Sequence, residues 1–275
     1  VTVGIMHFCT EKNIVIKMPA GVPPAVGDSF TSLIPAAVIV CLFGLITIVF
    51  NVRINDLLGI VFSPLAMAVN TPLGYGIYHM LCGLVFFCGI NSAVVIGVVQ
   101  PFIMQMGAAN EAAYLAGEAL PYAVTYATDT MIWAGGTGMT IGLVILMSFL
   151  AKSAQYKTIG RMSVVPAIFN INEPVIFGTP ICFNPIFFIP FVFCPGVMAF
   201  LTFLLTDMGI IGAPVVGMVP WTLPPVAVGI FMGAGNISNI IWSIACMVVP
   251  IIVYYPFFRM ADNAAYKEEL AAAEA

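Results

Sequence analysis

Long uncharged apolar stretches alternate with short polar breaks along most of the chain. About 20 apolar residues are enough to cross a bilayer as a helix. By that criterion the predicted spans are residues 29–52, 131–151, 187–206 and, in two parts, 210–257. Breaks at 220–225 and 233–236 interrupt the last of these stretches. The span at 131–151 begins near the glycine-rich run 135–138, which we interpret as helix packing because small residues let a neighbouring backbone approach closely.

Polar residues between these stretches predict how they are connected. Residues 54–69 are typical of an interfacial amphipathic helix rather than a second span. Residues 57–110 carry no acid, lysine or arginine and are too long for one helix, so we expect two helices that meet at a polar kink at 89–93. Residues 107–129 contain three acids and a proline, and we expect them to form a water-exposed loop.

A single acidic side chain stands apart from this pattern. Glu173 is the only ionisable residue between Arg161 and Asp207, and an unpaired carboxylate at membrane depth is costly unless it faces a cavity or a partner. Prolines follow Glu173 at short intervals and disfavour one continuous helix. We therefore predict that residues 165–190 form a re-entrant or discontinuous element, with Glu173 at its turn in a cavity. The structural alternative is an acid that caps free backbone amides.

Composition then fixes the class of protein. Hydrophobic residues make up 61% of the 275, charged residues 7%, and the mean hydropathy is +1.09, values that a soluble domain of this size does not reach. We predict an all-α polytopic membrane protein with broken helical hairpins around a central substrate cavity. The net charge of −4 comes without a polybasic segment, which argues against nucleic acid binding.

Metal and nucleophilic chemistry are poorly supported. The seven cysteines are scattered and form no C-x-x-C motif, so we expect neither a metal site nor a cofactor. His7 lies in the N-terminal tail, and His79 has no acid near it in the sequence, which favours a core or interfacial histidine. The chain shows no signal-peptide pattern, and its start at Val1 suggests a fragment.

The remaining candidates are uncharged polar groups and one acid at predicted breaks. Amides and a carboxylate beside an aromatic face suit a neutral sugar, because its hydroxyls donate and accept hydrogen bonds while its C–H face stacks on a ring. Trp221 has an alternative interpretation as an interfacial belt residue. The candidates are Asn91, Asn170, Asn172, Glu173, Asn184 and Trp221.

Charge placement and composition divide the chain into three parts. Lys152, Lys157 and Arg161 predict a cytoplasmic loop by the positive-inside rule, and Arg259 and Lys267 place the C-terminus on the same side. We expect a tail and connector at residues 1–27, a transmembrane sugar-transport domain at 28–258 and a solvated cytoplasmic tail at 259–275.

Several segments together resemble a known family. The run FNINEPVIFG at 169–178 is similar to the signature of the membrane-embedded IIC component of the lactose/cellobiose/diacetylchitobiose family of the bacterial phosphotransferase system. The further matching segments are residues 16–19, 22–26, 135–138, 151–153, 184–185, 219–222 and 254–258. The resemblance covers nearly the whole chain, whereas further helices that precede this region in the family, and form much of its dimer contact, are absent before Val1.

The resemblance implies a multi-pass permease of the bacterial inner membrane, homodimeric at full length. It would bind a disaccharide such as cellobiose or diacetylchitobiose and present the C6 hydroxyl to a phosphorylated IIB protein, itself supplied by IIA, with no phosphorylated residue in this chain. Glu173 would act as base or hydrogen-bond anchor for that hydroxyl, and Trp221 would stack on the sugar. Asn170, Asn172, Asn91 and Phe86 would complete the binding site.

One position departs from the family pattern. The family reads G-I-H-G where this chain has Asn91, and Phe86 replaces the tryptophan five residues earlier. An amide hydrogen-bonds a hydroxyl but exchanges no proton near neutral pH. The alternatives are therefore a permease-derived sugar carrier or sensor without phosphotransfer, or a truncated permease.

Overall fold

The computed structural model describes residues 2–16, 31–50, 64 and 67–274. The chain divides into two compact units, residues 1–62 and 63–275, and each is described by itself. In the first unit α1 (Thr2–Glu11) packs against α3 (Leu33–Phe50). Helix α3 confirms the described part of the predicted span at 29–52. The predicted interfacial helix at 54–69 lies largely outside the described residues.

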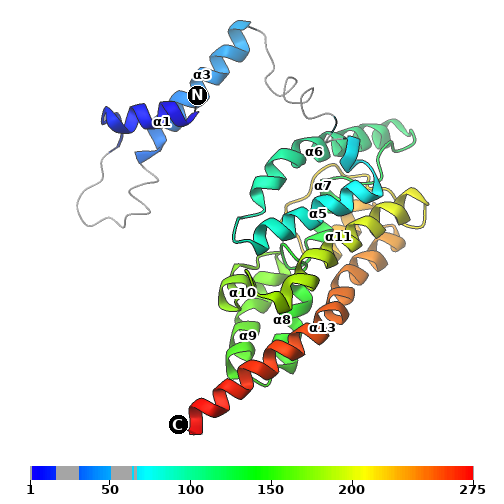
Figure 1. The fold of residues 1–275 in the computed structure, drawn as a ribbon. Helices are drawn as coiled ribbons and strands as arrows, with labels where there is room; N and C mark the ends of the chain where they lie inside the picture. Colours follow the sequence, from blue (N-terminus) through cyan, green and yellow to red (C-terminus); the bar gives the residue numbers. More distant parts are fainter. Residues whose placement is uncertain (1, 17–30, 51–63, 65–66, 275) are drawn as a thin grey trace. The chain divides into compact units, whose positions relative to one another are not determined.

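The second unit is helical, with no strand among its described residues. Its helices are joined by short breaks and turns (Figure 1). They are α5 (Pro72–Phe87), α6 (Ala93–Ala116), α7 (Tyr126–Ile132), α8 (Ile141–Leu150), α9 (Ala154–Ile168), α10 (Glu173–Gly178), α11 (Pro185–Asp207), α12 (Pro225–Met232) and α13 (Ile237–Glu274). By length and composition, α6, α11 and α13 could each cross a membrane.

Capping side chains define where several of these helices begin. Thr71 accepts a hydrogen bond from the Gly74 amide at 3.1 Å ahead of Pro72, the first residue of α5. Asn184 accepts one from Ile186 at 3.0 Å at the start of α11. Both caps satisfy amides that have no partner within the helix, and a proline at the first position needs none.

Close backbone contact joins α5 to α11. A Cβ atom at Gly83 would lie 2.9 Å from the Phe191 carbonyl oxygen, and one at Gly76 would lie 2.9 Å from the Gly196 carbonyl oxygen. Small residues allow this approach, which is a common way for membrane helices to associate without a hydrophobic driving force. Figure 1 shows the two helices side by side.

The predicted breaks are only partly correct. The kink at 89–93 separates α5 from α6, residues 233–236 separate α12 from α13, and α11 matches the predicted span at 187–206. The span predicted at 131–151 is wrong, because α7 ends at Ile132 and α8 begins at Ile141. The loop predicted at 107–129 is also wrong, since α6 continues to Ala116 and Asp129 lies buried in α7.

The C-terminal segment is a second correction. Residues 259–275 were expected to form a solvated tail, yet α13 carries the completely buried Asp262. Its carboxylate accepts hydrogen bonds from the backbone amides of Lys152 and Ser153 at 2.9 and 3.0 Å. Farther along α13, Glu269 accepts from Ala154 and Gln155 at 2.8 and 3.0 Å. The end of α13 therefore holds the start of α9. The domain boundaries at 27/28 and 258/259 remain predictions.

Candidate functional site

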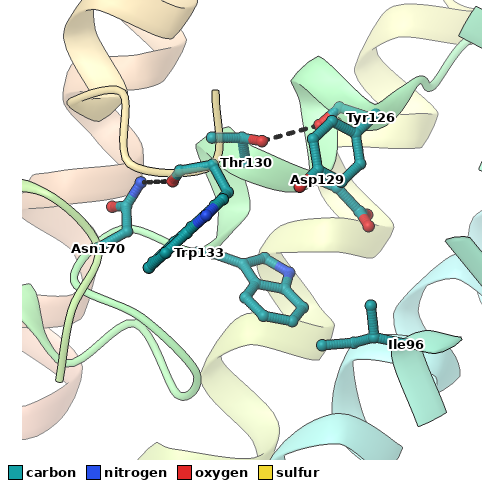
Figure 2. Close-up of a pocket in the computed structure, with 7 residues that line it drawn as sticks. Ile96, Tyr126, Asp129, Thr130, Trp133 and Asn170 are labelled. Atoms are coloured by element: carbon teal, nitrogen blue, oxygen red, sulfur yellow. Dashed lines mark hydrogen bonds between the residues drawn. The ribbon is translucent and has the colours of Figure 1, made fainter. Parts of the chain in front are cut away.

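A cavity of about 170 Å³ lies among the broken helices of the second unit. Its wall combines aromatic rings with a carboxylate, an amide and a hydroxyl (Figure 2). The lining residues are Ile96 from α6, Tyr126, Asp129 and Thr130 from α7, Trp133, Asn170 and Trp221. Rings that can stack and polar groups that can donate or accept hydrogen bonds are the surfaces that a sugar needs.

A network of three donors surrounds the buried carboxylate of Asp129. The Tyr75 hydroxyl donates to Oδ1 at 2.8 Å, and the Tyr78 hydroxyl donates to Oδ2 at 3.2 Å. Nε2 of His79 lies 3.0 Å from Oδ1. All three donors come from α5, where residues three and four apart lie on one face. They offset the cost of taking the carboxylate out of water.

The expectation that His79 has no acidic partner is therefore wrong. Its ring is 2% exposed and pairs with an acid 50 residues later in the chain. Sequence proximity cannot reveal such a pair. The available signal was the spacing of Tyr75, Tyr78 and His79, which puts three polar donors on one helix face and calls for a shared acceptor.

Asn170 connects three loops at the cavity wall. It has a left-handed backbone with φ of 62°, which asparagine tolerates better than most residues. Its Nδ2 donates to the carbonyl oxygens of Trp221 and Leu223 at 2.8 and 3.1 Å, while its Oδ1 accepts from the Gly135 amide at 3.1 Å. The amide thus fixes the Trp221 loop against the glycine-rich turn.

The glycine-rich run 135–138 is a turn between two short helices, and not part of a helix–helix contact surface as predicted. Gly136 has φ of 89°, and a Cβ there would lie 2.5 Å from Cγ of Asn172. Asn172 in turn donates from Nδ2 to the Thr137 carbonyl oxygen at 2.7 Å. Only glycine combines this backbone with so close a neighbour. Asn172 is therefore buried against the turn.

Glu173 occupies the break that its neighbouring prolines predict. Helix α9 ends at Ile168, α10 spans only Glu173–Gly178, and α11 starts at Pro185, so the discontinuous element at 165–190 is confirmed. The Glu173 side chain is exposed, and the expectation that an enclosed cavity surrounds it is wrong in the described structure. The reason is local: the acid begins a one-turn helix, where the helix dipole favours negative charge without burial. Its functional role remains a prediction.

The other predicted site residues divide between two locations. Trp221 and Asn170 line the cavity. Asn91 is exposed, and its Oδ1 accepts a hydrogen bond from the Ala93 amide at 2.8 Å, at the start of α6. Phe86 is buried near the end of α5, with its ring 6.3 Å from that of Phe191. The sequence therefore identified part of the cavity wall and missed Asp129, Tyr126, Thr130 and Trp133.

Apolar helices long enough to span a bilayer, interrupted helices between them and a partly polar cavity define a helical membrane protein with a small-molecule binding site. Residues 1–195 match the family described as "Phosphotransferase system, EIIC". Since this match covers well over half of the chain, the protein belongs to that family.

Individual relatives agree with this assignment. The lichenan permease IIC component of Bacillus subtilis (strain 168) is 38% identical over 98% of this chain and 61% of its own length. The lactose-specific EIICB component of Staphylococcus aureus (strain N315) is 38% identical over 98% of the chain and 48% of its own length. The chain thus spans about three fifths of the lichenan permease and about half of the lactose component.

A solved structure gives the same result for the fold. The crystal structure of the transporter ChbC, the IIC component from the N,N'-diacetylchitobiose-specific phosphotransferase system, superposes with a TM-score of 0.74. The two chains are 33% identical, and the match covers 98% of this chain and 64% of ChbC. The predicted fold class and family resemblance are confirmed.

Proposed function

We propose that this chain is the sugar-binding portion of a IIC permease that moves a disaccharide of the cellobiose or diacetylchitobiose type across the bacterial inner membrane. The observation that carries the proposal is the match of nearly the whole chain, at 33–38% identity, to proteins named for lichenan, lactose and diacetylchitobiose systems. The cavity supports it, because three aromatic rings and a few polar groups suit a neutral sugar better than an ion.

The chemistry that we propose couples movement to phosphorylation of the C6 hydroxyl by a phosphorylated IIB protein, which IIA supplies. The name of the lactose-specific EIICB relative supports IIB as the partner. Glu173 would orient the hydroxyl and accept its proton, which helps attack on a phosphoryl group. Its exposed position on a one-turn helix suits contact with a second protein. The permease would work as a homodimer in lipid.

The other assigned residues would bind or position the sugar. Trp221 is 56% exposed and presents its ring at the cavity wall, as stacking requires. Asn170 and Asn172 would act chiefly by holding the Trp221 loop and the glycine-rich turn, since their amides already bond backbone groups. Asn91 and Phe86 would form the wall near the end of α5.

Uptake of radiolabelled cellobiose tests this proposal in cells that lack their own cellobiose permease. We expect Glu173→Gln to lower uptake about 10- to 100-fold, because amide nitrogen neither accepts a proton nor replaces the carboxylate as acceptor. Glu118→Gln, at an exposed acid beyond the end of α6, is the matched control and should transport normally. Unchanged uptake by the Glu173 variant at equal membrane levels would remove Glu173 from the mechanism.

One observation favours a second candidate, a sugar carrier or sensor without phosphotransfer. Asn91 replaces the family histidine and uses its side-chain oxygen to cap α6, so it offers no proton acceptor. Transfer of label from phosphorylated IIB to cellobiose, measured in membrane vesicles, separates the two candidates. Phosphotransfer that rises in Asn91→His supports a role for the imidazole, whereas facilitated uptake without any phosphosugar supports the second candidate.

A further inference from the structure

The Asp129 carboxylate has one hydrogen-bonding position that the protein leaves unused. An ionised carboxylate offers about four acceptor positions, two on each oxygen. Tyr75 and His79 occupy those of Oδ1, and Tyr78 occupies one of Oδ2. Because Asp129 also lines the 170 Å³ cavity, the remaining position on Oδ2 is available to a donor from a cavity ligand.

The neighbouring Trp133 supplies the complementary group. Its indole Nε1 is buried and has no hydrogen-bond partner within the part of the chain that the structure describes. A buried donor without an acceptor is costly, and such groups are rare unless a ligand completes them. The Trp133 ring lines the same cavity as Asp129 and follows it by four residues, with its backbone amide bonded to the Asp129 carbonyl oxygen at 3.1 Å.

One unused acceptor beside one unused donor fits a particular kind of group. A hydroxyl donates one hydrogen bond and accepts others, whereas an ammonium only donates and a carboxylate only accepts. In the view of Figure 2 the nitrogen of the Trp133 indole lies on the ring edge turned toward Asp129. Both groups belong to α7 or the residues directly after it, so they are held together on one rigid segment.

We propose that Asp129 and Trp133 form a hydroxyl-binding subsite for one ring of the sugar, with Asp129 Oδ2 as acceptor and Trp133 Nε1 as donor. Tyr75, Tyr78 and His79 are positioning residues that hold the carboxylate in its ionised form and fixed orientation. The inference rests on the proposed sugar-binding function. It adds a contact to that function at a distance in sequence from the Glu173 segment.

The subsite should also contribute to specificity. A site whose buried polar groups are built to bond a hydroxyl rejects an analogue that lacks it, because both groups are then left without partners. The aromatic rings of Tyr126 and Trp221 accept any sugar face that stacks. We therefore expect the rings to set affinity in general and the Asp129–Trp133 pair to select which hydroxyl is required.

Trp133→Phe is the decisive variant because it removes only the indole N–H and part of the ring. Since that N–H bonds nothing in the described protein, folding should be unaffected. Trp242→Phe is the matched control: its indole donates to Thr202 Oγ1 at 2.8 Å, in the contact between α13 and α11, and is not part of the cavity wall. Asp129→Asn is a second variant, in which the three α5 donors face a neutral amide.

The experiment is isothermal titration calorimetry of the purified chain in nanodiscs with cellobiose, diacetylchitobiose and lactose, followed by the monodeoxy analogues of the best binder. We expect Trp133→Phe to weaken binding of the parent sugar about tenfold, which is the loss of one hydrogen bond. One deoxy analogue should bind wild type about tenfold more weakly than the parent sugar, yet bind Trp133→Phe almost as well as the parent does. Trp242→Phe should show the wild-type pattern.

The outcomes separate the two proposals. Equal affinity of wild type and Trp133→Phe for the parent sugar, or the same penalty for every deoxy analogue in both proteins, would overturn the subsite while leaving the sugar-binding function intact. Failure of folded wild type to bind any of the three disaccharides would reject both proposals. Loss of binding in Asp129→Asn supports the subsite only if circular dichroism and the melting temperature show that the variant is folded.

Discussion

The anchoring of α9 by α13 leads to a quantitative prediction at Asp262. This side chain is completely buried and accepts hydrogen bonds from the backbone amides of Lys152 and Ser153. Asp262→Ala removes the acceptor and leaves two amides at the α8–α9 junction without partners. The junction between the two helices should therefore open, and the whole unit should lose stability.

The magnitude follows from the number of groups left unpaired. Each buried amide that loses its partner costs about 1–3 kcal/mol, so Asp262→Ala should lower the free energy of unfolding by about 2–6 kcal/mol. The start of α9 also loses a favourable negative charge at its N-terminus, worth about 0.3–1 kcal/mol. Asp262→Asn keeps one acceptor oxygen and should cost less than alanine.

Glu269 provides a control within the same contact. It also accepts hydrogen bonds from two backbone amides, those of Ala154 and Gln155, but these lie at the exposed surface. Water replaces the lost carboxylate there, so Glu269→Ala should cost about 0.5–1 kcal/mol, near the low end for a helix cap. The two variants lose the same number of amide partners, and the difference between them measures the effect of burial.

Unfolding by sodium dodecyl sulfate in mixed micelles, followed by far-ultraviolet circular dichroism, gives both free energies. Hydrogen exchange of the Lys152 and Ser153 amides reports the local effect and should accelerate in Asp262→Ala. If Asp262→Ala and Glu269→Ala shift unfolding equally, or if the Lys152 and Ser153 amides stay protected, then the carboxylate does not hold this junction and the argument from burial is wrong.

Three further predictions concern glycines and a tyrosine. Gly83→Ala should lower stability by about 1–3 kcal/mol through overpacking against rigid backbone, whereas Gly97→Ala, with open space at its Cβ position in α6, should raise it by up to about 1 kcal/mol in the same unfolding assay. Gly136→Ala should cost at least about 1–3 kcal/mol from its left-handed backbone and displace Asn172, so cellobiose affinity and melting temperature should both fall; a variant with unchanged values would show that the turn adapts. Burial, with nearby acids, raises the pKa of Tyr156 to about 12; because the unfolded pKa is about 10, stability should decline as pH rises from 10 toward 12, and a melting-temperature series in which Tyr156→Phe declines as steeply would contradict this.

Local backbone chemistry made the broken element around Glu173 predictable from sequence. Proline cannot continue a helix without losing a hydrogen bond, and the prolines after Glu173 mark where α10 and α11 begin. The same reasoning failed at Gly135 and Gly136, because glycines suit both close helix packing and a left-handed turn. The positive φ values decide between these, and they become apparent only with the tertiary structure.

Contacts between distant segments were not predictable. Asp129 was assigned to a loop because acids near membrane ends usually face water, yet α5 brings three donors to it from more than 50 residues away. Asp262 was assigned to a solvated tail for the same reason, and its partners lie about 110 residues earlier. In both cases charge placement along the chain gave the wrong environment, because burial depends on which donors the fold brings to the acid.

The glycine contacts between α5 and α11 limit how the molecule can change shape. At Gly76 and Gly83 the two main chains meet with no intervening layer of side chains, and it is such a layer that changes rotamer when helices slide or tilt past one another. These two helices therefore travel as one block. Since α5 carries the donors that hold Asp129, the block takes one wall of the cavity with it, and any opening that admits a sugar must form along a different seam of the unit.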